Sequence, residues 1–194
     1  MPARRITVAA IGKNRLVMKS EFVSAPKTGG ALKPFGVFET PDFELDCALL
    51  SLGSVPVILC IGSDRVTGDC LGPITGQMLV ELGVPAFVYG TLDKPVTALN
   101  LRDCISHIKS VHQDKKVLAI DSSVGKLSDV GKIRVAFGSI APGSADGKNL
   151  PKVGDVSITA TVTDPVSTPL GAVRLGIVYS LARSIATRIV QGLQ

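Results

Sequence analysis

Residues 55–73 read VPVILCIGSDRVTGDCLGP, an apolar run that passes into a glycine-punctuated loop carrying two acids. The run VPVILC is continuous, apolar and of strand length, which is typical of a strand buried on both faces of a parallel sheet. The loop ends in a Gly-Pro pair, and Pro73 suits the first turn of a helix that we predict over residues 71–83. Asp64 and Asp69 therefore lie between the end of a central strand and the start of a helix.

Outward from this stretch, the chain alternates between strand and helix patterns. Further strands are predicted at residues 86–90, 117–120, 133–140 and 156–163. A second helix has apolar residues at helical spacing at Leu101, Cys104, Ile105, Ile108 and Val111, and a long C-terminal helix has them at Val173, Ile177, Leu181, Ile185 and Ile189. This alternation predicts an α/β fold, a three-layer α/β/α sandwich with a largely parallel central sheet.

The charge distribution predicts one folded domain preceded by a basic arm. The net charge of +5 comes from residues 1–34, which hold seven Lys or Arg and one acid; the remainder holds fourteen basic and fifteen acidic residues. Residues 22–47 are rich in Pro, Gly and polar residues and are interpreted as an extended connector, while ITVAAIG near the start is a candidate for an isolated or swapped strand. We expect residues 1–50 to form the arm and connector, and residues 51–194 to form a single α/β domain.

The composition argues against several classes of protein. A hydrophobic content of 45% and a charged content of 19% are typical of a soluble globular protein. Without eighteen consecutive apolar residues or a secretory signal pattern, neither a membrane span nor export is expected. Low aromatic content and the lack of a basic helix argue against nucleic-acid binding. Four cysteines without C-x-x-C spacing fit reduced thiols in a cytoplasmic protein.

A third acid follows another predicted strand. Asp121 comes directly after the apolar run VLAI. Ligands of open α/β sheets bind beyond the carboxyl ends of the strands, where Asp64, Asp69 and Asp121 can converge. Two neighbouring carboxylates push each other's pKa apart, so that one stays ionised while the other holds a proton. The pattern therefore predicts general acid–base hydrolysis or capture of a hard cation.

Competing motifs are absent or weak. The loop lacks G-x-G-x-x-G, a P-loop lysine and G-x-S-x-G. Cys70 as a nucleophile would need a base, but His107 projects away from the apolar stripe of its helix and His112 lies at the end of that helix. A small core thiol is the better account of Cys70.

Each acid also has a structural alternative, which stays open at this point. Asp69 could cap the helix that follows it. Asp121 and Asp155 could turn the chain at strand ends, and Asp64 could stabilise a turn together with Arg65.

Five linked motifs carry a family resemblance: IGSDRVTGDCLGP, VYGTLDKPVTALNL, AIDSSVG, VGKIRVAFGSIAPG and LPKVGDVSIT. Together they resemble the YyaC-type sporulation proteins of endospore-forming bacteria, which are relatives of the germination protease that degrades small acid-soluble spore proteins. The resemblance covers roughly residues 54–165. More distantly, the arrangement is similar to the hydrogenase-maturation endopeptidases, whose fold is an α/β/α sandwich.

The resemblance implies a pair of catalytic aspartates. The germination protease uses an Asp in a D-A-L-G-P segment and another at the end of an apolar strand, and these match Asp69 in GDCLGP and Asp121 in AIDSS. In the maturation endopeptidases, acids at these two places and a His from a later loop hold a metal. The later segment here, VGDVSIT, offers Asp155 and no His. The resemblance therefore favours an aspartate pair without a cofactor; a metal-dependent alternative would use Asp69, Asp121 and Asp155.

The sequence thus predicts a peptidase-like domain, an endopeptidase of sporulation or spore germination in the cytoplasm of the forespore or spore core. Asp69 and Asp121 are the predicted catalytic residues, and Asp64, Thr91 and Asp93 are predicted to contact the substrate. The expected partner is a protein or peptide, by resemblance a small acid-soluble spore protein, and a homo-oligomer is left open. Two alternatives also stay open: a metal-assisted maturation-type endopeptidase, and a non-catalytic binding or regulatory protein on the same fold.

Overall fold

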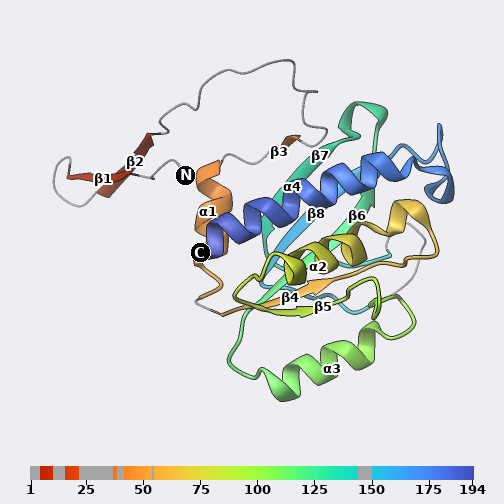
Figure 1. Cartoon of the computed structure of the whole chain (residues 1–194), viewed down its shortest axis with the longest axis horizontal. Helices are drawn as coiled ribbons and strands as arrows, with labels where there is room; N and C mark the ends of the chain where they lie inside the picture. Colours follow the sequence, from red (N-terminus) through yellow and green to blue (C-terminus); the bar gives the residue numbers. More distant parts are fainter. Residues whose placement is uncertain (1–4, 11–15, 22–36, 39–41, 54, 144–149) are drawn as a thin grey trace. The chain divides into compact units, whose positions relative to one another are not determined.

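The computed structural model describes residues 5–10, 16–21, 37–38, 42–53, 55–143 and 150–194. The chain divides into two compact units, of which the first is Met1–Lys33. It contains an antiparallel hairpin of β1 (Arg5–Ala10) and β2 (Leu16–Glu21), which form a two-stranded sheet (Figure 1). The strand predicted at ITVAAIG is therefore present as β1.

The second unit, Pro34–Gln194, is built on a six-stranded sheet in the order β3-β7-β8-β6-β4-β5. Its strands are β3 (Val37–Phe38), β4 (Val57–Cys60), β5 (Phe87–Tyr89), β6 (Val117–Val124), β7 (Lys132–Phe137) and β8 (Val156–Thr163). Its helices are α1 (Asp42–Leu50), α2 (Leu71–Glu81), α3 (Leu101–Val111) and α4 (Leu175–Leu193), with short turns η1 (Thr67–Asp69), η2 (Leu127–Asp129) and η4 (Leu170–Ala172). Strands β8, β6, β4 and β5 are parallel, and β7 is antiparallel to β8.

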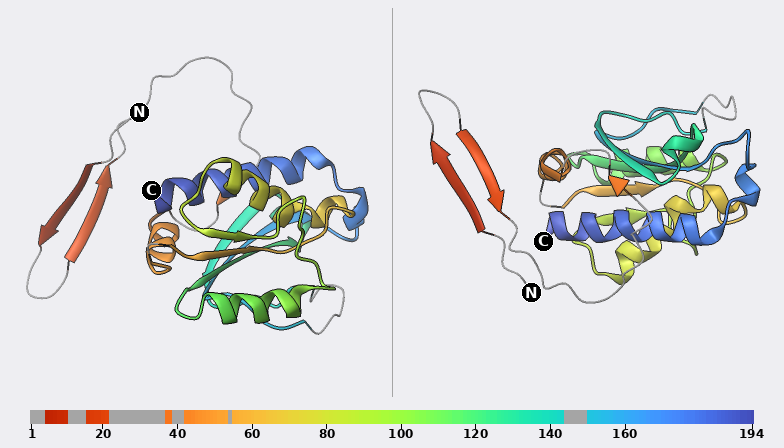
Figure 2. Two further views of the ribbon diagram at one scale, coloured as in Figure 1. Left: turned by 60° about the horizontal axis from the view of Figure 1, so that its bottom comes forward. Right: turned by 90° about the horizontal axis from the view of Figure 1, so that it is seen from above.

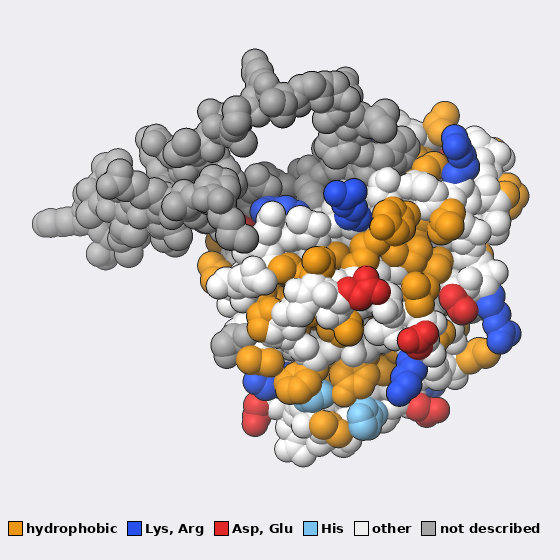
Figure 3. Space-filling model, viewed as in Figure 1, with side chains coloured by type: hydrophobic (Ala, Val, Ile, Leu, Met, Phe, Trp, Pro, Cys, Tyr) orange, Lys and Arg blue, Asp and Glu red, His pale blue; other side chains and the backbone are white. Residues whose placement is uncertain are grey.

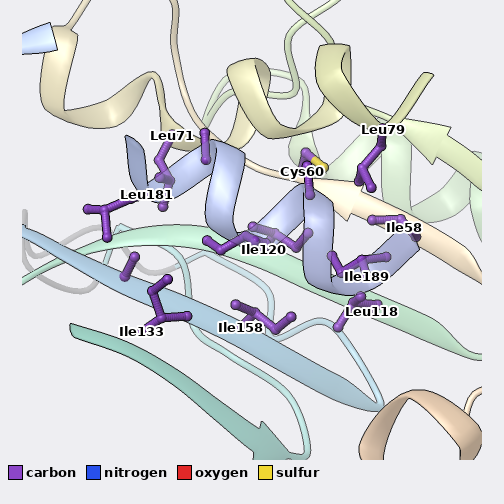
Figure 4. Packing of buried hydrophobic residues seen from close by; sticks show 14 of the residues in the cluster. Ile58, Cys60, Leu71, Leu79, Leu118, Ile120, Ile133, Ile158, Leu181 and Ile189 are labelled. Carbon is purple, nitrogen blue, oxygen red and sulfur yellow. The ribbon is translucent and has the colours of Figure 1, made fainter. Parts of the chain in front are cut away.

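Helices cover both faces of this sheet, and the side chains of β4 show why. Figure 2 shows helices on both faces. Ile58 and Cys60 lie in one apolar cluster with α1, α2 and α4 (Figure 4). Val57 and Leu59 lie in a second cluster with α3. All four side chains are fully buried. A strand buried on both faces needs an apolar residue at every position, which the sequence VILC supplies. The predicted three-layer α/β/α sandwich with a largely parallel sheet is confirmed.

The predicted helical stripes are buried except near their ends. In α3 the buried residues are Leu101, Ile105 and Ile108, and in α4 they include Leu181, Ile185 and Ile189. Cys104 is half-buried, and Val111, the last residue of α3, is 57% exposed. Among the helices that the structure describes, none is both long and apolar enough to cross a membrane.

Helix α1 corrects the prediction of an extended connector up to residue 47. Its side chains Leu45 and Leu49 are buried in the cluster that α4 also contacts, and Arg188 of α4 lies 3.6 Å from the carboxylate of Asp46. Close packing continues at Gly192, where a Cβ atom would collide with the side chain of Leu49. Residues 42–50 are thus part of the second unit, although the sequence placed its start at residue 51.

Candidate functional site

The end of β4 is packed tightly against the start of α2. Gly62 has a φ of 146°, and a Cβ atom there would collide with the carbonyl oxygen of Asp69, which accepts a hydrogen bond from the N–H of Ser63 at 3.1 Å. A Cβ atom on Gly72 would likewise collide with the carbonyl oxygen of Ile61. Only glycine lets the backbone come this close to a carbonyl oxygen at the two positions. These close contacts hold Asp69 beside the carboxyl end of β4.

Asp69 is half-buried and ends the turn η1, just before α2. The cap residue of α2 is Cys70, and its side chain makes no capping hydrogen bond. Asp69 therefore does not occupy the capping position that was its structural alternative.

Asp121 lies within β6, which continues to Val124 beyond the predicted strand end at residue 120. It is paired with Thr159 of β8, and on the other side the N–H of Ile61 donates to the carbonyl oxygen of Ile120 at 2.7 Å. The side chain of Asp121 is only 9% exposed. The interpretation of Asp121 as a turn residue is therefore wrong: it is a buried acid between two neighbouring strands.

The environment of Asp121 favours its protonated form. Burial, and after it the negative charge of Asp69, raise the pKa of Asp121 from 3.8 to about 8, while a hydrogen bond from the backbone of Ser122 acts in the opposite direction. At neutral pH the two groups together therefore hold one proton, on Asp121. A neutral acid next to a carboxylate is the arrangement that general acid–base catalysis requires.

An open cleft of about 1560 Å³ lies at this edge of the sheet. Its walls are the loop after β4, strand β5 with the loop that follows it, the start of α3, and the side chains Leu150 and Leu170. Asp64, Asp69, Thr91 and Asp93 all line it, and their catalytic and substrate-contact roles stay predictions. On the face that carries α2, β5 and α3, charged side chains are interspersed with apolar ones (Figure 3).

The two predicted contact residues in the loop after β5 have different surroundings. The Thr91 hydroxyl accepts a hydrogen bond from the N–H of Lys94 at 3.3 Å, so this residue also stabilises a turn. Asp93 and Asp64 are exposed and line the cleft. The structure therefore leaves Asp93 and Asp64 accessible to a bound molecule.

The sequence reasoning missed part of the lining of the cleft. Tyr89, Asn100, Cys104 and His107 all contribute to it. The hydroxyl of Tyr89 lies 2.9 Å from Nε2 of His112, which ties β5 to the end of α3. The sequence feature that could have identified two of them is their spacing. Cys104 and His107 are three residues apart, which places them on the same side of a helix.

Asp155 lies far from the aspartate pair. Its carboxylate accepts the N–H of Val117 at 2.8 Å, at the amino end of β6. Asp121 is four residues further along β6, about 13 Å away at the usual rise of a strand. The set Asp69, Asp121 and Asp155 is therefore not brought together, and the metal alternative that used it is wrong.

The donors at the site do not fit a metal centre of the maturation-endopeptidase kind. In the part of the chain that the structure describes, no three His, Cys, Asp or Glu side chains gather as a metal-binding set. Asp69 and Asp121 supply two carboxyl groups, and the pKa of Asp121 is raised in the way that favours a proton on it. A third ligand from the segment before β8 would have to be Asp155, whose carboxylate instead accepts a hydrogen bond from the N–H of Val117.

Cys70 fits the core-thiol interpretation. Its side chain is 7% exposed and belongs to the apolar cluster around α2 and α4. Burial, with smaller contributions from the charges of Asp64 and Asp69, raises the pKa of the Cys70 thiol. The protonated thiol is a poor nucleophile, so the chemistry of the site falls to the carboxyl groups.

Comparisons with known proteins agree with this fold. Residues 44–188 match the model of the family described as "Protein of unknown function (DUF1256)". The chain is 41% identical over 111 residues to "Uncharacterized protein YyaC" from Bacillus subtilis (strain 168). That alignment covers 57% of this chain and 54% of the relative, so the chain spans about half the length of the curated relative it matches. The expected relationship to YyaC is confirmed.

A solved structure shows the same architecture. The crystal structure of a NiFe hydrogenase maturation protease, HycI from Thermococcus kodakarensis, is similar with a TM-score of 0.51 and 16% sequence identity. The match covers 77% of this chain and 98% of that chain. The expected distant similarity to maturation endopeptidases is confirmed at the level of the fold.

Proposed function

The chain belongs to the DUF1256 family, and from its fold and its carboxyl pair we propose that it is an endopeptidase. Asp69 and Asp121 are the proposed catalytic residues. The observation that carries the proposal is the burial of Asp121, whose pKa is raised by that burial and by the charge of Asp69, while Asp69 itself lines an open cleft. Strongly raised pKa values of this kind concentrate at functional sites. The fold shared with a maturation protease supports the same conclusion.

The proposed reaction uses one proton held by the pair. Asp69, ionised and facing the cleft, takes a proton from a water molecule whose oxygen attacks the carbonyl carbon of a peptide bond. Asp121 supplies the proton that the departing amine requires when the C–N bond breaks. Asp69 is then protonated and Asp121 ionised, and transfer of one proton within the pair restores the starting state. No cofactor enters this sequence.

The cleft indicates a polypeptide as the substrate. Its volume of about 1560 Å³ exceeds the range of about 300–1,000 Å³ usual for small-molecule pockets. An open cleft at a sheet edge is also accessible to a segment of a longer chain. Within this proposal, the resemblance to the germination protease supports small acid-soluble spore proteins as substrates and the forespore or spore core as the location.

The proposed function is tested by cleavage of defined proteins. Purified wild-type protein is incubated with a small acid-soluble spore protein and, in parallel, with unfolded casein, with and without EDTA. We expect cleavage that EDTA does not reduce, a loss of about 10²–10⁴-fold in Asp69→Asn and in Asp121→Asn, and little further loss in the double variant, because the two groups act as one unit. Asp114→Asn, an exposed acid outside the cleft lining, is the matched control.

Three outcomes would contradict the proposal. Full cleavage by either single Asn variant would exclude the pair as the catalytic unit. Loss of cleavage with EDTA that added Zn²⁺ restores would return the assignment to a metal-assisted endopeptidase. Lack of cleavage of either protein by the wild type would favour a binding or regulatory protein on the same fold.

A further inference from the structure

Strand β5 ends the sheet of the described residues and leaves one side of its backbone open. It pairs with β4 only. On the side that faces β4, the N–H of Phe87 donates to the carbonyl oxygen of Pro56 at 3.0 Å. Backbone groups alternate in direction along a strand, so the N–H and C=O of the next residue, Val88, point away from β4. Val88 is half-buried and lines the cleft.

The open edge of β5 is continuous with the proposed catalytic site. The same cleft extends from Val88 through the loop after β5 to Asp69. A chain lying along β5 inside this cleft therefore passes Asp69. The space next to a free strand edge is where extended peptides add to a sheet, with main-chain hydrogen bonds providing affinity.

The lining also indicates the character of the occupant. The charged side chains of the cleft are the acids Asp64, Asp69, Asp93 and Asp103 and the bases Arg65 and Lys94. This acidic excess complements a neutral or positively charged segment. Two exposed leucines, Leu92 at 39% and Leu99 at 96%, offer apolar contact area along the same wall.

The position of Leu99 is fixed by its loop. The side-chain oxygen of Asn100 accepts the N–H of Thr97 at 2.7 Å, and its amide nitrogen donates to the carbonyl oxygen of Pro95 at 3.1 Å. The N–H of Leu99 itself donates to the hydroxyl of Thr97 at 3.2 Å. A leucine presented to solvent by an ordered loop is pre-organised for contact with a partner, since little entropy is lost on binding.

We propose that the substrate segment binds as an additional β-strand on β5, with main-chain hydrogen bonds to the N–H and C=O of Val88. The proposal rests on the endopeptidase function above and specifies its substrate class. That class is an extended polypeptide segment of neutral or positive charge with apolar side chains that contact Leu92 and Leu99. Recognition then depends mainly on the backbone of the substrate, and folded segments are excluded.

The test is an N-methyl scan of bound peptides. Dodecapeptides tiled across casein and a small acid-soluble spore protein are screened for binding to the Asp121→Asn protein by fluorescence anisotropy. Each tight binder is then resynthesised with single backbone N-methyl groups. Methylation removes one N–H donor, so we expect about tenfold weaker binding at the one position whose N–H donates to the carbonyl oxygen of Val88. We expect little change at the neighbouring positions, which serve as the internal control.

A change in the protein gives an independent readout. Val88→Pro removes the N–H on the open edge and keeps the bonds of Phe87 and Tyr89 to β4, and proline is tolerated on edge strands at such positions. We expect a cooperative thermal melt at a lower temperature, because the side chain of Val88 packs against the core, and about tenfold weaker peptide binding. Should the variant fail to fold, the methyl scan still decides.

The possible outcomes separate this proposal from the proposed function. A methyl scan with one sensitive position, but without cleavage by the wild type, would support the added strand and overturn the endopeptidase. Cleavage together with a flat methyl scan and full binding by folded Val88→Pro would overturn the added strand and leave the endopeptidase intact. If no tiled peptide binds, the added strand is also overturned.

Discussion

At the scale of single residues, the proposed chemistry depends on the carboxyl group of Asp121. It is 9% exposed on a central strand, and the charge of Asp69 acts on it in addition to burial. The same two groups must therefore make the stability of the protein depend on pH.

Asp121→Asn should remove most of this pH dependence. Between pH 3.8 and about 8 the native protein holds a proton on Asp121 that the unfolded chain has lost. The free energy of unfolding of the wild type should therefore decrease as pH rises through this window, by up to about 1.4 kcal/mol per pH unit. We expect melting curves of the two proteins to agree near pH 4 and the Asn variant to melt higher at pH 8. A wild type whose stability increases over this range would contradict the raised pKa.

The sequence predicted this pair only in part. Acids after apolar runs indicated Asp69 and Asp121, because carboxyl ends of parallel strands share one edge of a sheet. That Asp121 is buried inside β6 did not follow, since the chain after VLAI reads DSSV and its polar residues favour a turn over a strand. The predicted position of Asp155 was wrong for a related reason. Asp155 precedes β8, so it lies at the amino ends of the strands, where its carboxylate accepts a hydrogen bond from the N–H of Val117.

At the scale of elements, the contact between α2 and β4 positions Asp69. Gly72 is the second residue of α2, and the backbone of Ile61 occupies the place of its missing Cβ. Gly176 is the second residue of α4, and a Cβ atom there would meet nothing within 4 Å. The two glycines form a matched pair that differs only in packing.

Gly72→Ala should therefore destabilise the protein, whereas Gly176→Ala should not. Overpacking against a backbone carbonyl is expected to cost about 1–3 kcal/mol, while alanine in an open helical position is neutral or stabilising by up to about 1 kcal/mol. Urea unfolding of both variants measures the difference. Equal stabilities would show that α2 can move away from β4, and Asp69 would then not be fixed where the chemistry needs it.

Elements with strong local patterns were predictable, and α1 was not. Strand β8 lies at Val156–Thr163 as predicted, and α2 starts at Leu71 as predicted, because an alternating stretch rich in β-branched residues and a Gly-Pro boundary define them locally. Helix α1 has only nine residues and follows a segment rich in Pro and Gly. Short helices are stabilised mainly by tertiary packing, here that of Leu45 and Leu49, and the sequence does not show packing partners.

At the scale of the whole molecule, the chain consists of two compact units that differ in net charge. Met1–Lys33 carries seven basic residues and one acid, while Pro34–Gln194 contains the sheet, the carboxyl pair and the cleft. The predicted boundary at residue 50 lies at the end of α1, whose buried leucines belong to the second unit.

Two truncations should therefore behave differently. Deletion of residues 1–33 should leave the cooperative melt of the remainder unchanged, because the second unit keeps its whole core. Deletion of residues 1–50 also removes Leu45 and Leu49, and loss of two buried leucines should cost at least about 4 kcal/mol. Differential scanning calorimetry distinguishes the two. A loss of cooperative melting after the shorter deletion would show that the first unit is required for folding.

The most direct measurement of the central claim, that Asp69 and Asp121 ionise as one unit, is a titration of their carboxyl ¹³C resonances by NMR. The account predicts that Asp121 of the wild type titrates with an apparent pKa of about 8, and that Asp69→Asn lowers this value because one of its two causes is removed. The same titration of Asp114→Asn should match the wild type. An Asp121 that titrates at about 4, the ordinary value of an aspartate, or one that Asp69→Asn leaves unchanged, would contradict the coupled pair.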